Sequence, residues 1–150
     1  MRIGPFLILG RGDFLKYVYT EIKEEKRCRG CVISRLFIRY PEDVGNGVLN
    51  AFFKSQADRF YGYITENVFP KTEADFTSYL ENGGRRSYFS PREFRLTVEA
   101  AEISENVICV KTEVLYTEKS SVKEQKNFSD LFDTKTGTVI RKRKARKIKV

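Results

Sequence analysis

The residues with the most obvious chemical potential are two cysteines close together in the chain. Cys28 and Cys31 form a Cys-x-x-Cys motif. A reactive motif of this kind usually lies at a helix N-terminus, which lowers the thiol pKa. Here the two cysteines flank Arg29-Gly30, a plausible two-residue hairpin turn. We therefore expect structural turn cysteines or, alternatively, a regulatory disulfide, because residues flanking such a turn lie about 5.5 Å apart at Cα.

Few other residues of the sequence have the type or spacing of a catalytic or metal site. The chain has no histidine, so a serine or cysteine nucleophile would lack its usual base. Its three cysteines cannot supply the four cysteine or histidine ligands that a structural zinc takes. Four carboxylates (Glu24, Glu25, Asp130 and Asp133) lie in turns and strands without the spacing of an acid–base pair. We expect a protein that is not an enzyme and holds no metal or cofactor.

Positive charge is concentrated at the C-terminus. The net charge is +8, but seven basic residues lie among the last ten: Arg141, Lys142, Arg143, Lys144, Arg146, Lys147 and Lys149. Without them, 21 basic residues face 20 acidic ones, so the body is close to neutral. Such a tail attracts the phosphates of nucleic acid or anionic lipid. The alternative is a solvated, disordered end, since the tail has no interleaved aromatic residues for base stacking.

Aromatic residues form a third candidate site. Twelve phenylalanines and eight tyrosines supply all of the aromatic surface. Tyr61, Tyr63, Tyr79 and Phe89, with the neighbouring Tyr88, could line a groove for an extended peptide or a sugar chain. Aromatic residues in such positions also commonly seal a helix–sheet core. Both interpretations stay open at this point.

The elements that would position these residues follow from periodicity. Residues 17–26 and 31–40 are expected to form a hairpin. A helix should begin after Asn46, with one apolar stripe at steps of three and four residues: Leu49, Phe52, Phe53, Ala57, Phe60, Ile64 and Val68. Pro70 disfavours helical geometry at the preceding residue. It therefore predicts a second helix over roughly 71–82, which Thr72 with Asp75 would cap.

Three strands are expected to follow. Alternating apolar residues predict strands over 94–100 and 108–116, and a last strand near 126–132 leads into a turn at 133–137. The fold class is α+β: an antiparallel sheet of about five strands with two consecutive helices packed on one face, in the order β-β-α-α-β-β-β. Residues 1–140 would form one domain, followed by the basic tail 141–150.

The chain carries no predicted targeting segment. The apolar run 5–9 is shorter than the core of a secretory signal, and no segment is long enough to span a membrane. An odd number of cysteines fits a reducing compartment. A cytoplasmic location is expected for the chain as written, or an extracytoplasmic one if an N-terminal segment has been removed.

Four stretches resemble one bacterial domain family of unknown function. They are Phe37-Ile38-Arg39-Tyr40-Pro41, then Leu49-Asn50-Ala51-Phe52-Phe53, Pro91-Arg92-Glu93-Phe94-Arg95-Leu96-Thr97, and Phe132-Asp133-Thr134-Lys135-Thr136-Gly137. The resemblance covers roughly residues 17 to 140. The family occurs in the extracytoplasmic part of lysozyme-responsive anti-sigma factors, beside some peptidoglycan deacetylase domains, and as small stand-alone proteins. Where it commonly has a Gly-Gly-Ala-His loop, this chain has Glu118-Lys119-Ser120-Ser121.

The resemblance implies a non-catalytic binding or sensing domain linked to cell-envelope proteins. Its partner would be a protein or a cell-wall-related ligand, with nucleic acid or an anionic surface as an alternative partner for the tail alone.

Overall fold

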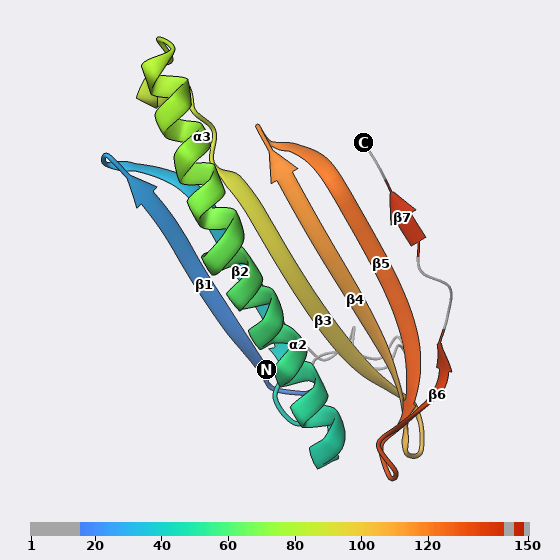
Figure 1. Ribbon diagram of the computed structural model, residues 1–150. Helices are drawn as coiled ribbons and strands as arrows, with labels where there is room; N and C mark the ends of the chain where they lie inside the picture. The colour runs from blue at the N-terminus through green and yellow to red at the C-terminus, as the bar shows by residue number, and fades with distance from the viewer. Residues whose placement is uncertain (1–15, 143–145, 149–150) are drawn as a thin grey trace.

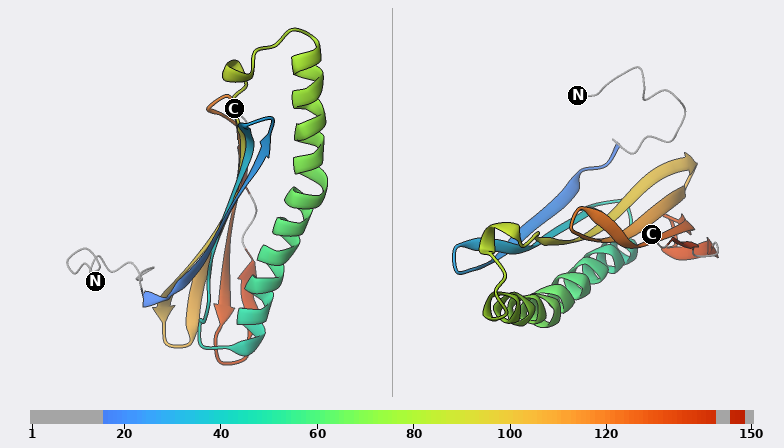
Figure 2. Two further views of the ribbon diagram at one scale, coloured as in Figure 1. Left: turned by 90° about the vertical axis from the view of Figure 1, so that its left-hand side faces the viewer. Right: turned by 90° about the horizontal axis from the view of Figure 1, so that it is seen from above.

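The computed structural model describes residues 16–142 and 146–148, which form one twisted sheet with a long helix lying across one face (Figures 1 and 2). The strands are β1 (Tyr19–Cys28), β2 (Cys31–Pro41), β3 (Arg92–Ser104), β4 (Val107–Glu118), β5 (Ser121–Asp133), β6 (Thr138–Lys142) and β7 (Arg146–Ile148). Strands β1 to β6 lie side by side in chain order, and β7 pairs with β5. The α+β class is confirmed, but the sheet has more strands than the expected five.

Tight turns join the first two strands and the fourth and fifth. Arg29 and Gly30 both have positive φ, at 51° and 80°, and Cys28 pairs with Cys31 across the turn. Lys119 and Ser120 repeat this geometry between β4 and β5, with φ of 56° and 61°. Two consecutive residues with positive φ are the mark of a type I′ turn, whose twist matches that of the strands it joins. The hairpin predicted for the N-terminal strands is confirmed.

One continuous helix replaces the two that were predicted. It consists of α2 (Gly47–Tyr63), a π-helical turn η2 (Ile64–Val68) and α3 (Phe69–Glu81). Phe69 stays helical, with φ −58° and ψ −46°, and its N–H donates to the carbonyl of Ile64, five residues back. Pro70 has no N–H, and in a regular α-helix its ring would crowd the carbonyl four residues earlier. The wider π turn accommodates the ring, so the proline does not separate two helices.

The single helix also decides the sheet's direction. β2 and β3 pair in parallel, from Ser34 opposite Arg92 to Arg39 opposite Thr97, while the other pairs are antiparallel. The prediction of a purely antiparallel sheet is therefore wrong. A long helix that runs the length of the sheet returns the chain to the end where β2 began, so that β3 enters in the same direction.

The core lies between this helix and the inner face of the sheet. Alternating apolar residues of the strands are buried, among them Leu36, Ile38, Leu96, Val98 and Val110. The helix contributes Leu49, Phe53, Ala57, Ile64, Phe69 and Phe76. Phe52 belonged to the predicted stripe but is 46% exposed, beside the buried Phe53.

The predicted cap of the second helix is wrong. Thr72 is 1% exposed and its hydroxyl donates to the carbonyl of Val68 at 3.1 Å, inside the continuous helix. Its expected partner, Asp75, instead contacts the sheet. The helix ends as predicted: Asn82 is its C-cap, and Gly83 has a φ of 91°.

Asn46 joins the start of α2 to the turn after β5. Its side-chain oxygen accepts the N–H groups of Val48 and Leu49 at 2.9 and 3.0 Å. Its amide nitrogen donates to the carbonyl of Thr134 at 2.9 Å. Gly137, with a φ of 78°, packs so closely that a Cβ there would lie 2.8 Å from the Asn46 oxygen. Residues 88 positions apart in sequence therefore share one junction.

Parts of the basic tail belong to the sheet. Arg141 and Lys142 end β6, opposite Leu131 and Asp130, and the backbone of 146–148 pairs with 125–127 of β5. The expectation of disorder does not hold at these positions. Arg143, Lys144 and Lys149 lie outside the described residues, as do the side chains of Lys142, Arg146 and Lys147.

The sheet face opposite the helix is covered by no other element of residues 16–142 and 146–148 (Figure 2, left). Among those residues no helix combines the length and apolar character needed to cross a bilayer.

Candidate functional site: the Arg92 pocket

A pocket opens where the end of α3 overhangs the start of β3 and the β4–β5 turn. Its volume is about 410 Å³, within the range of roughly 300–1,000 Å³ typical of small-molecule sites. We call it the Arg92 pocket, and its main lining residues are Asp75, Tyr79, Tyr88, Phe89, Arg92 and Glu118. These residues come from a helix, a connecting segment and two strands, which only the folded chain brings together.

Arg92 is the centre of the pocket's polar network. Its Nη1 donates to Asp75 Oδ2 at 2.8 Å, and its Nε lies 3.0 Å from Glu118 Oε2. The arginine side chain is 20% exposed and that of Glu118 28%, so water screens these ion pairs only in part. The hydrogen bond from Arg92 lowers the pKa of Asp75, against a smaller opposing effect of burial. The network therefore keeps Asp75 ionised and positions both carboxylates beside the Arg92 guanidinium.

Aromatic rings form the opposite wall. Phe89 lies edge-on to Phe76, with ring centroids 4.8 Å apart, and 5.4 Å from the ring of Tyr79. The guanidinium of Arg92 lies 6.0 Å from the centroid of Phe89. Tyr88, which is 71% exposed, presents its ring to solvent at the rim, where Arg85 lies 5.6 Å from its centroid. The wall combines packed rings with one that is free to contact a ligand.

The segment after α3 fixes the orientation of Tyr79. The tyrosine hydroxyl donates to the carbonyl of Arg85 at 2.9 Å and accepts the N–H of the same residue at 3.2 Å. Gly84 passes over the ring so closely that a Cβ there would lie 2.3 Å from Tyr79 Cζ. Glycine at this position lets the chain wrap around the tyrosine, and the wrapped segment then delivers Tyr88 and Phe89 to the pocket.

Tyr116 adds a second hydroxyl close to the network. Its ring stacks on Phe94, with centroids 4.9 Å apart and an angle of 3° between planes. Burial, reinforced by the charge of Glu118, raises the pKa of the Tyr116 phenol. The hydroxyl stays protonated at neutral pH and can donate a hydrogen bond.

The four aromatic residues predicted to line a groove do not all come together. Tyr79 and Phe89 line the Arg92 pocket. Tyr61 packs against the core with its hydroxyl 3.2 Å from Glu24, while Tyr63 is 59% exposed on the helix. The groove interpretation therefore describes Tyr79 and Phe89, and the core interpretation describes Tyr61.

Sequence reasoning missed the charged half of the site, although a signal was present. Arg92 continues the phase of Phe94, Leu96 and Val98, which face the core, and Glu118 continues the inward phase of β4. A charged residue that extends the apolar phase of a strand must find a partner or a solvent-filled pocket. Because Arg92 and Glu118 lie at the same end of neighbouring strands, this pattern indicated that the two side chains contact each other.

The other predicted sites remain separate from this pocket. Cys28, Cys31 and Cys109 are free thiols, and Cys28 Sγ lies 3.9 Å from Glu73 Oε2. Arg141 is exposed on β6.

The charged groups of the pocket's polar network are engaged with one another. Asp75 and Glu118 are tied to Arg92, and the pKa of Asp75 is shifted away from that of a general base at neutral pH. Among the described residues no three potential ligands gather as a metal site would require. The arrangement offers ring faces for stacking and fixed charges for hydrogen bonding.

No family model matches the sequence, and no curated protein is recognisably related to it. The resemblance to the envelope-associated family therefore stays a prediction.

Proposed function

We propose that this chain is a non-catalytic binding domain and that the Arg92 pocket takes a short segment of a cell-wall sugar chain. The observation that carries the proposal is the pairing of the fixed Asp75–Arg92–Glu118 network with the exposed ring of Tyr88. The C–H face of a sugar ring is apolar and stacks on aromatic side chains, while its hydroxyls donate to carboxylates. The link to the cell envelope comes from the family resemblance.

Preorganisation supports a binding role. Arg92 is held by two carboxylates, one from α3 and one from β4, so a ligand meets donors and acceptors that are already in place. Such sites lose less conformational entropy on binding than sites built from mobile side chains. The exposed rim residues, Tyr88 and Lys119, remain free to adjust to the ligand.

Titration with soluble peptidoglycan fragments, followed by calorimetry or amide chemical shifts, tests the proposal. Tyr88→Ala should weaken binding about tenfold, because the ring face is lost without disturbing the core. Tyr63→Ala removes a similarly exposed tyrosine outside the pocket and serves as the matched control. Equal binding by both variants, or turnover of the fragments, would contradict the proposal.

A further inference from the structure

The helix-free face of the sheet carries a second pocket, independent of the first. Four residues stand directly opposite one another across β1 to β4: Lys23 faces Phe37, Phe37 faces Arg95, and Arg95 faces Leu115. Direct partners on neighbouring strands project from the same side of a sheet. Their neighbours along the strands, Leu36 and Leu96, are buried against the helix, so this row points the other way. We call it the Phe37 row.

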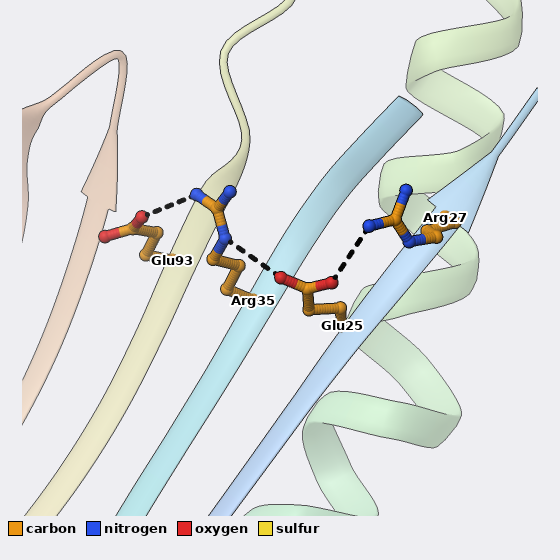
Figure 3. Close-up of polar contacts among 4 residues, drawn as sticks. All are labelled: Glu25, Arg27, Arg35 and Glu93. Atoms are coloured by element: carbon orange, nitrogen blue, oxygen red, sulfur yellow. Dashed lines mark hydrogen bonds and ion pairs between the residues drawn. The ribbon is translucent and has the colours of Figure 1, made fainter. Parts of the chain in front are cut away.

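A charged group flanks the row on one side. Arg35 lies between two carboxylates, with Nε 3.4 Å from Glu25 and Nη1 3.2 Å from Glu93, and Arg27 approaches Glu25 at 3.5 Å (Figure 3). Every side chain in this group has a partner of opposite charge. The group is locally neutral and needs no ligand to compensate it.

The other side of the row repeats the pattern. Arg39 contacts Glu21 at 3.4 Å and Glu99 at 2.9 Å, and its guanidinium lies 3.9 Å from the centroid of the Tyr19 ring. Both arginines of β2 on this face are therefore satisfied by two carboxylates each.

The two cations of the Phe37 row differ from these arginines. Within residues 16–142 and 146–148, neither Lys23 nor Arg95 has a carboxylate at ion-pairing distance. The Lys23 ammonium lies 5.8 Å from the centroid of the Phe37 ring. Two cations without an ion-pair partner among these residues thus lie on the strands either side of one half-buried aromatic ring.

A pocket of about 260 Å³ includes all four residues of the row. Arg35 and the carboxylates Glu24, Glu25 and Glu93 also line it. Glu25 and Glu93 are paired with Arg35, and Glu24 accepts the hydroxyl of Tyr61. The volume falls just below the range of sites for drug-sized ligands, so the pocket fits a compact molecule of one or two rings. Stacking on Phe37 would bury the ligand's apolar body, and charge-assisted hydrogen bonds would hold an anionic group.

We infer that the Phe37 row is a binding site for a small aromatic acid, a planar apolar molecule bearing one carboxylate or similar anion. The site lies on the sheet face opposite the Arg92 pocket and does not depend on the function proposed for that pocket. Lys23 and Arg95 hold the anionic group, and the Phe37 ring stacks on the body of the ligand.

The test is an amide chemical-shift titration of the full chain with 1-naphthoate. Shifts should concentrate at Phe37, Arg95 and Leu115. Lys23→Gln should weaken binding about tenfold, as expected when a charge-assisted hydrogen bond is lost. Lys123→Gln makes the same exchange at an exposed position outside the pocket and should change binding less than about twofold. The neutral analogue 1-naphthalenemethanol should bind about tenfold more weakly than naphthoate.

Three results would overturn the inference. They are an absence of shifts at millimolar naphthoate, shifts centred on another face of the sheet, and equal binding of the acid and the alcohol. Arg95→Gln provides an independent check, because it removes the second cation from a different strand and should reproduce the effect of Lys23→Gln.

Discussion

The Asn46 junction allows the most quantitative prediction. Asn46→Ala removes the cap from two N–H groups of α2, which costs about 1 kcal/mol. It also removes the donor to the Thr134 carbonyl, worth about 1 kcal/mol more. The free energy of unfolding should fall by about 2 kcal/mol, which lowers Tm by about 4–8 °C for a chain of this size. Thermal and urea unfolding followed by circular dichroism measure both quantities.

Asn46→Ser separates the two contributions. Serine keeps an oxygen that can cap the helix, but its side chain is too short to reach the carbonyl of Thr134. The expected loss is about half that of alanine. If serine and alanine destabilise the protein equally, the capping interaction contributes nothing and the reasoning fails.

Gly137 tests the junction from its other side. Gly137→Ala places a side chain at a φ of 78° and 2.8 Å from the Asn46 oxygen. The backbone conformation alone should cost about 1–2 kcal/mol, and the contact adds to it. When Gly137→Ala is combined with Asn46→Ala, the close contact with the Asn46 oxygen is lost. The double variant should therefore be more stable than the sum of the two single effects predicts, by about 0.5 kcal/mol or more. Strict additivity would show that the two residues do not interact.

Three further predictions concern the core, the Arg92 pocket and the tail. Phe53→Ala should cost about 3–5 kcal/mol, because the ring is 1% exposed, whereas Phe52→Ala at 46% exposure should cost much less; urea unfolding compares them. Folding lowers the pKa of Asp75, so the ionised carboxylate stabilises the folded protein. This stabilisation is fully present above pH 3.8, the ordinary pKa of the group, and is lost as the pH falls through the lowered pKa. Asp75→Asn should therefore flatten the stability profile below about pH 4, while an unchanged acid limb would contradict this assignment. Deleting residues 143–150 should abolish any binding of nucleic acid if the tail provides it, and that binding should fall steeply with salt, as a titration at several salt concentrations would show.

Local sequence patterns predicted the structure correctly where a residue type strongly favours one backbone conformation. Gly30 beside Arg29 indicated a two-residue turn, and the alternation through Leu96 and Val98 indicated a strand with one buried face. Both hold in the structure. Pro70 misled because a proline's effect depends on the width of the helical turn around it. The π turn at Ile64–Val68 gave no signal in the sequence.

The Arg92 pocket shows the same limit at the level of a site. Arg92 and Glu118 could be recognised in the sequence as charges on the apolar phase of their strands. Their partner Asp75 lies on a helical segment whose direction depends on whether Pro70 ends the helix before it. A contact between a strand and a distant helix turn is set by how the two elements cross, and no periodicity encodes that angle.

The sequence by itself determined the element types and which faces are apolar, because periods of two and 3.6 residues follow from strand and helix geometry. Tertiary structure decided how the chain runs between them. Two helices would have brought the chain back to the end where β2 finishes and made β3 antiparallel to it. One helix through Pro70 carries it to the opposite end, makes the pair parallel, and places Asp75 over Arg92.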